Sequence, residues 1–118
     1  MALKLSSRQQ AQLAFLQMLP PKLERIRTVI EKMGANQADE AEVRALGRLL
    51  DEIKSQAGQL SITGVADTAG LMSTMSRRGG ALQMKVRGLR ELFGSLKINY
   101  EGAVKSASTP EREPEAQA

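Results

Sequence analysis

Residues 43–60 read VRALGRLLDEIKSQAGQL, and their apolar side chains recur with the period of a single helix face. The gaps between successive members alternate between three and four residues, as an α-helix requires of side chains that share one buried stripe. The stripe consists of Val43, Leu46, Leu50, Ile53, Ala57 and Leu60. We therefore predict a helix of roughly 20 residues that packs through this stripe against the rest of the chain.

The chain ahead of this segment predicts two more helices. Residues 19–33 carry apolar side chains at the same alternating spacing, and Gly34 follows where a helix commonly ends. The serines at 6–7 are suitable N-terminal caps for a shorter helix, which the prolines at 20–21 interrupt or bend. The second of these prolines also suits the first turn of the helix that follows.

The chain beyond the central segment predicts the remaining helices. Residues 62–75 and 82–100 each carry a further apolar stripe, and the sequence RRGG at 77–80 predicts the loop between them. Four long amphipathic helices with short connections favour an all-α fold, an antiparallel four-helix bundle with the short N-terminal helix packed across one end. We assign this bundle to residues 1–105. Residues 106–118 contain no large apolar side chain and are predicted to form a disordered tail.

The composition narrows the possible functions. A chain of 118 residues with 42% hydrophobic content fits one domain with a modest core. It has no cysteine and no histidine, so thiolate nucleophiles, imidazole bases and the usual transition-metal ligands are missing. The start, MALKLSSRQQ, has no apolar signal region, and no apolar run is long enough to span a membrane. We expect a soluble cytoplasmic protein that is not an enzyme and holds no cofactor or metal.

The outer face of the central helix is the candidate functional surface. At about 100° per residue, the positions opposite the apolar stripe are expected to be exposed to solvent. They are Arg44, Arg48, Asp51, Ser55 and Gly58, with Gly47 and Lys54 at the flank. Two glycines within a helix each cost about 1 kcal/mol relative to alanine, so they call for a reason. One reason is close packing against a neighbouring helix, and the other is a flat patch on which a second protein can sit.

Residues 51–58, DEIKSQAG, resemble the signature of histidine-containing phosphotransfer (HPt) domains. That signature is a histidine followed by any residue, Leu or Ile, Lys, Gly, two small residues and Gly, and Ile53, Lys54, Ala57 and Gly58 match it. The flanking sequences FLQMLPPKLERIRTVIEKM and ITGVADTAGLMSTM resemble the helices on either side of the family's site. The resemblance implies a four-helix bundle whose phosphotransfer face docks the acidic pocket of a response-regulator receiver domain or the ATP-binding domain of a histidine kinase.

Two departures from the signature bear on activity. Asp51 stands where the family has its phosphorylatable histidine, and Ser55 stands where it usually has glycine. Phosphorelay needs an imidazole nitrogen as the acceptor. A carboxylate acceptor would need Mg²⁺ held by further acidic residues, and Glu52 is the only acidic neighbour in this stretch. We therefore expect a degenerate form without phosphotransfer activity, a pseudo-HPt module.

The expected function of such a module is to bind receiver or histidine-kinase domains and to modulate signalling by occupancy. The predicted contact residues are Arg44, Gly47, Arg48, Asp51, Lys54, Ser55 and Gly58. The three cations among them suit an acidic partner, whereas the carboxylate of Asp51 would mildly repel a receiver's carboxylates or approach its Mg²⁺. The alternative is that these charges form an ordinary solvated helix face.

Two other functions remain open. The net charge is +4, and a basic stripe on the last helix could bind nucleic acid or a membrane surface. The stripe holds Arg87, Arg90 and Lys97, with Arg77, Arg78 and Lys85 nearby. Acidic residues on the same helix face and the lack of interleaved aromatic residues favour simple solvation. The third possibility is an architectural bundle that dimerises through exposed apolar residues such as Leu71, Leu49 or Phe15.

Overall fold

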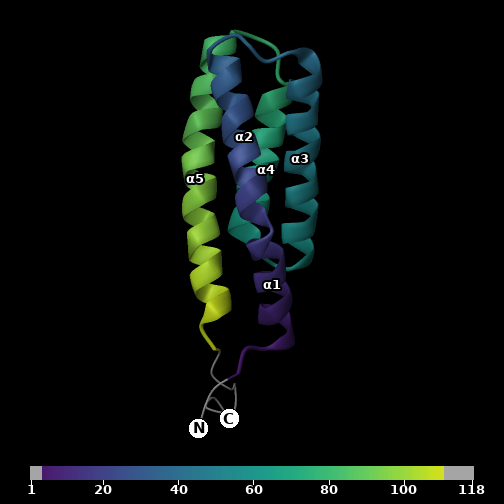
Figure 1. Cartoon of the computed structure of the whole chain (residues 1–118), viewed down its shortest axis with the longest axis vertical. Helices are drawn as coiled ribbons and strands as arrows, with labels where there is room; N and C mark the ends of the chain where they lie inside the picture. Colours follow the sequence, from purple (N-terminus) through teal and green to yellow (C-terminus); the bar gives the residue numbers. More distant parts are fainter. Residues whose placement is uncertain (1–3, 111–118) are drawn as a thin grey trace.

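The computed structural model describes residues 4–110, and these residues form five helices and no strand. The helices are α1 (Ser7–Gln17), α2 (Leu19–Gly34), α3 (Glu40–Gln59), α4 (Thr63–Arg77) and α5 (Leu82–Ser108). The prediction of an all-α fold is confirmed. Figure 1 shows α2 to α5 lying side by side along the long axis of the molecule, with the chain direction alternating from one helix to the next.

Helix α3 has the predicted length, 20 residues, and local signals define both of its ends. At its start Asp39 and Glu42 form a capping box: the Asp39 side chain accepts from the Glu42 backbone N–H (2.7 Å), and the Glu42 side chain accepts from the Asp39 backbone N–H (3.2 Å). At its end Ser61 adopts a left-handed φ of 60°, which turns the chain into α4 within three residues.

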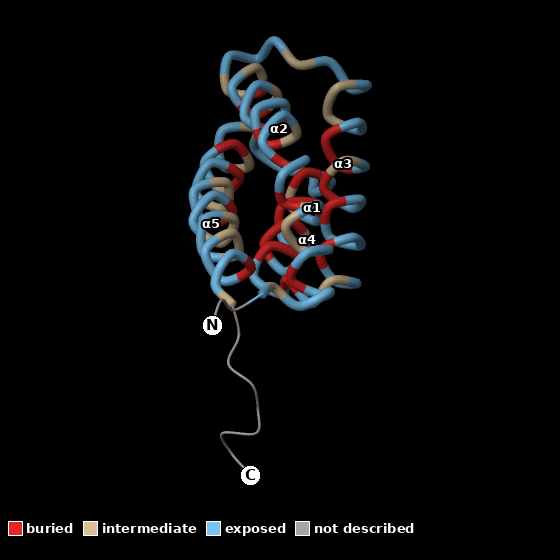
Figure 2. Tube along the Cα trace, turned by 60° about the horizontal axis from the view of Figure 1, so that its bottom comes forward, coloured by how far each residue is buried: buried red, intermediate tan, exposed pale blue. Residues whose placement is uncertain are grey.

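The predicted stripes meet in one core. Leu46, Leu50, Ile53 and Ala57 of α3 are at most 2% exposed. In Figure 2 the buried segments of the helices line the inside of the molecule, and the exposed segments lie outside. The other helices contribute Leu16, Leu19, Ile26, Ile30, Val65, Ala69, Met72, Val86, Leu89 and Leu96, among others. This single cluster of aliphatic and methionine side chains is the main source of the hydrophobic stabilisation.

Helix α1 does not cross the end of the other helices as the sequence suggested. In Figure 1 it continues roughly in the line of α2 and lies beside the last turns of α5. The prolines at 20–21 explain this arrangement, because they occupy the first turn of α2, where backbone N–H groups have no partner within the helix. They therefore start α2, and only Met18 separates it from α1.

The C-terminal helix extends beyond the boundary that the sequence suggested at residue 105. Residues 106–108 are the last turn of α5, and Ala107 in this turn is only 2% exposed. The buried side chain of Gln9 donates to the backbone carbonyls of Thr109 (2.6 Å) and Ser106 (3.3 Å) at the C-terminal end of α5. Of the expected disordered tail, residues 111–118 lie outside the described residues.

We predict that Leu50→Ala lowers the free energy of unfolding by about 2–5 kcal/mol, because Leu50 is fully buried in the core. The control Arg48→Ala, two residues away on the exposed side of the same helix, is expected to stay within about 0.5 kcal/mol of the parent. Chemical denaturation monitored by circular dichroism measures both. Equal losses would contradict the orientation of α3.

Candidate functional site

The structure exposes six of the seven predicted contact residues on one face of α3, and the exception is Gly47. The exposed six are Arg44, Arg48, Asp51, Lys54, Ser55 and Gly58. The two glycines of α3 therefore have different surroundings. A Cβ at Gly58 would meet nothing within 4 Å, so no packing within the described chain requires a glycine there.

Gly47 is buried because the end of α4 lies over it. A Cβ at this position would lie 3.2 Å from Nη2 of Arg77 and 3.4 Å from Oγ of Ser76. Close packing against α4, one of the two reasons that the sequence left open, therefore accounts for this glycine, and Gly47 is buried where the sequence placed it at the flank of an exposed face. The guanidinium group of Arg77 lies on the surface above it, half-exposed to solvent.

Asp51 is bound by two side chains of α4. Ser73 Oγ donates to Asp51 Oδ1 (2.5 Å), and Arg77 donates through Nη2 to Oδ2 (2.6 Å) and through Nη1 to Oδ1 (3.3 Å). Arg77 also donates to the hydroxyl oxygen of Ser73. The hydrogen bonds from Arg77 and then Ser73 hold the pKa of the Asp51 carboxyl below its ordinary value, which keeps the group ionised.

The sequence pattern does not indicate this network, because RRGG at 77–80 predicts a loop that would include Arg77. Arg77 is instead the last residue of α4. A usable signal was present in the chain order: in an antiparallel pair of helices joined by a short turn, residues equally far from the turn face each other. Asp51 and Ser73 are equally far from Ile62, and so are Gly47 and Arg77.

Lys54 lies across α4 in the same way. Its aliphatic stem covers Gly70, where a Cβ would lie 3.2 Å from Lys54 Cδ. The lysine stem thus packs on the neighbouring helix while its ammonium group stays at the surface. Next to it, α3 has a shallow open depression lined by Asp51, Lys54, Ser55, Gly58 and Gln59. The depression is broad and accessible, which suits contact with another macromolecule better than enclosure of a small ligand.

The electrostatic balance of this face differs from the sequence-based expectation. Arg77 compensates the charge of Asp51, so the carboxylate does not face a partner as an isolated negative group. Within residues 4–110, Arg48 and Lys54 form no ion pair, and Arg44 makes only a long, exposed contact of 3.7 Å with Glu40. The face therefore carries a positive excess. We call the surface of Arg44, Arg48, Asp51, Lys54, Ser55, Gly58 and Arg77 the α3 face.

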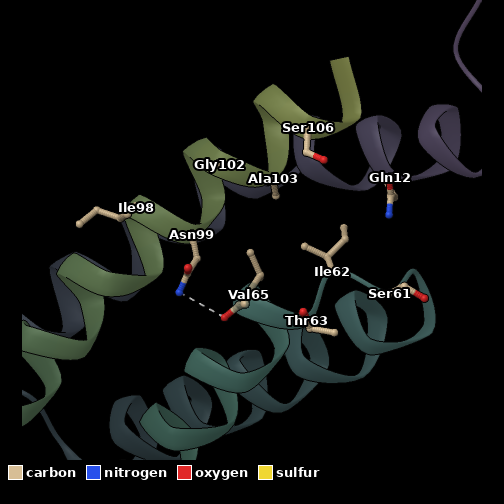
Figure 3. Close-up of a pocket in the computed structure, with 11 residues that line it drawn as sticks. Gln12, Ser61, Ile62, Thr63, Val65, Ile98, Asn99, Gly102, Ala103 and Ser106 are labelled. Carbon is tan, nitrogen blue, oxygen red and sulfur yellow. Dashed lines mark hydrogen bonds between the residues drawn. The ribbon is translucent and has the colours of Figure 1, made fainter. Parts of the chain in front are cut away.

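A second hollow lies beside the C-terminal half of α5. It is formed by the start of α4, the C-terminal half of α5 and Gln12 of α1 (Figure 3). Its polar groups are already paired: Asn99 donates to the Gly64 carbonyl (3.3 Å) and to Thr68 Oγ1 (2.9 Å), and Gln12 donates to the Leu60 carbonyl (2.8 Å). This hollow contains none of the residues selected from the sequence.

Comparison with known proteins does not assign the chain to a family. No family model matches its sequence, and no curated protein and no solved structure shows significant similarity to it. Two features of the structure concern metal binding and membrane spanning. Within residues 4–110, no three acidic side chains gather in a way that could hold a metal ion. No helix in the same range is long and apolar enough to cross a membrane.

The Asp51 network predicts a specific pH dependence. Because folding lowers the pKa of Asp51, its ion pair stabilises the protein above the ordinary carboxyl pKa and is lost as the pH falls through the lowered value. Asp51→Asn should lower the free energy of unfolding by up to about 1 kcal/mol at pH 7, since the pair is half-exposed. The difference should shrink below about pH 4.

The matched control is Asp67→Asn, because Asp67 is an exposed aspartate of α4 that has no ion pair within residues 4–110. Its effect should be small, because the substitution removes no ion pair within residues 4–110. Denaturant titrations of the three proteins between pH 2 and 7 measure these differences. A deficit for Asp51→Asn that is unchanged at pH 2 would show that charge is not its cause.

Proposed function

We propose that the protein is a non-catalytic, HPt-like four-helix bundle of the cytoplasm. Its α3 face binds the receiver domain of a response regulator or the catalytic domain of a histidine kinase. Binding modulates signalling by occupying the partner's phosphotransfer surface. No phosphoryl group passes through this chain.

The observation that carries this proposal is the uncovered C-terminal part of the α3 face. Ser55 and Gly58 are exposed on the last turns of α3, and a Cβ at Gly58 would meet nothing within 4 Å, although glycine weakens a helix. Arg48 and Lys54 are exposed on the same face, and within residues 4–110 neither forms an ion pair. A flat patch with a positive border is complementary to an acidic protein surface, which is the surface that a receiver domain offers around its phosphorylation site.

The Asp51 network supports a binding role without chemistry. The carboxylate is already engaged by Arg77 and Ser73. The chain has no histidine, and residues 4–110 contain no cluster of acidic side chains for a metal ion that could activate a phosphoryl group. Since Arg77 compensates its charge, Asp51 does not oppose an acidic partner. The compensated pair can instead serve as a fixed polar contact at the centre of the interface.

The nucleic-acid alternative has weaker support. Arg90, a member of the basic stripe on α5, is held by Glu31 at 2.8 Å. Glu91 and Glu101 are also exposed on α5, which breaks the positive field that phosphate binding requires.

The first test concerns phosphoryl transfer. Incubation of the chain with phosphorylated receiver domains, or with an autophosphorylating histidine kinase, should leave it unmodified, as measured by intact-protein mass spectrometry. The positive control is an HPt domain with an intact histidine. A stoichiometric mass gain of one phosphoryl group on this chain would disprove the inactive assignment.

The second test concerns the docking face. Reversal of two unpaired cations, Arg48→Glu with Lys54→Glu, should weaken binding to the cognate receiver or kinase domain by about tenfold or more, mainly through slower association. The effect should diminish at high salt, because these charges are exposed. Surface plasmon resonance against the receiver and kinase domains of the same genome, at two salt concentrations, measures both rates.

The matched control makes the same charge change on another helix, Lys97→Glu with Lys105→Glu on α5. This variant should bind the cognate domain nearly as well as the parent. If the α5 variant loses more affinity than the α3 variant, the docking surface is not the α3 face. If only nucleic acid binds, with affinity that falls by orders of magnitude as salt rises, the proposed function is wrong.

A further inference from the structure

The outer face of α5 has two features that the fold of one chain does not explain. Met84 and Ile98 are 76% and 69% exposed, although both are large and apolar. Ile98 lies at the hollow shown in Figure 3, which Gly102 also lines. The same helix holds Gly94 and Gly102, and a Cβ at either position would meet nothing within 4 Å. These two glycines weaken the helix without any packing benefit inside the described chain.

One face of α5 forms a regular seam, in which Gly88 is half-buried and the other five members are exposed. Six positions between residues 84 and 102 follow one another at alternating gaps of four and three, which is the spacing of a helix that packs along another helix. In order they are Met84, Gly88, Glu91, Ser95, Ile98 and Gly102. Long and short side chains alternate strictly along this seam. It lies on the side of α5 away from the buried Val86, Leu89 and Leu96.

The alternation makes the seam complementary to itself. When two copies of α5 pack antiparallel about a two-fold axis beside residues 93–94, each long side chain lies opposite a short residue of the second copy. Met84 faces Gly102 and Glu91 faces Ser95 across the axis. Ile98 comes beside Gly88, where it contacts the Met75 side chain of α4 that lies over this glycine. Glu91 is the one charged member, and the Ser95 hydroxyl of the second copy can donate to its carboxylate. Parallel packing would instead place long side chains against long ones.

The residues on both sides of the seam are also compatible with antiparallel packing of two α5 helices. Arg87 and Glu101 are equally far from Gly94, so each would face the opposite charge on the second copy. Neither of them forms an ion pair within residues 4–110. On the other edge, Leu71 of α4 is 59% exposed and borders the same hollow as Leu92, near the middle of the seam. Gly94 at the axis lets the two helices approach closely.

We propose that this chain forms a homodimer through antiparallel packing of its two α5 seams, closed by reciprocal Arg87–Glu101 ion pairs. Of the three apolar residues that the sequence suggested for dimerisation, Leu71 is largely exposed, whereas Leu49 and Phe15 pack against the core. Figure 1 places α5 and α3 at opposite sides of the molecule, so dimerisation leaves both α3 faces free. The inference does not depend on the proposed signalling function.

The first test is a charge exchange measured by sedimentation equilibrium of the full chain. The parent should be a dimer at micromolar concentration. Arg87→Glu should raise the dimer dissociation constant at least tenfold, because it places like charges opposite each other at two symmetric sites. Adding Glu101→Arg to the same chain should restore most of the affinity. A parent that stays monomeric up to about 0.5 mM would overturn the proposal, and so would a double variant that is no better than the single one.

The second test separates dimer contacts from monomer stability. Gly102→Leu and Gly94→Leu have open space in the monomer, so they should leave folding intact and raise the melting temperature of the monomer, yet block the approach of the second copy. Both should raise the dimer dissociation constant at least tenfold. The control is Gly58→Leu on α3, another helical glycine in open space, which should leave dimerisation unchanged. Equal effects of all three substitutions, or none at residues 94 and 102, would overturn the proposed seam.

Discussion

The antiparallel packing of α3 on α4 is the interaction on which the rest of the structure depends. Ser61 reverses the chain with a left-handed backbone conformation, and the turn between the two helices has only three residues. The helices then meet through the fully buried Ile53, Val65 and Ala69. The short turn sets the register of the pair, and in this register Asp51 meets Ser73 and Gly47 meets Arg77, each pair equally far from Ile62.

This register decides the electrostatics of the surface as well as the core. It places Ser73 opposite Asp51. Two long cationic side chains, Arg77 and Lys54, lie across the contact between α3 and α4. One cation compensates the carboxylate, and the other leaves its ammonium group free at the surface. The polar network is therefore a consequence of the register in which the two helices pack. A partly compensated and net positive face is suited to recognition of an acidic protein surface.

The helical glycines of the protein separate into two groups with different physical roles. Gly47, Gly70 and Gly88 each lie beneath a long side chain of a neighbouring helix, so a glycine is needed for packing within the chain. Gly58 and the pair in the second half of α5 have open space around them. The open glycines occur on two separate faces, one on α3 and one on α5. We infer that these faces are the surfaces at which other protein molecules replace the missing contacts.

The sequence by itself determined the helices, their core stripes and the exposure of six of the seven candidate residues. These properties depend on periodicity and on capping groups a few residues apart, such as Asp39 and Glu42, so neighbouring residues contain the information. Only the tertiary structure decided that Gly47 is covered, that Arg77 binds Asp51, and that α5 continues past residue 105. The last example shows the physical reason. Gln9 stabilises the end of α5 from 100 residues away, and a contact between such distant segments exists only once the core has brought them together.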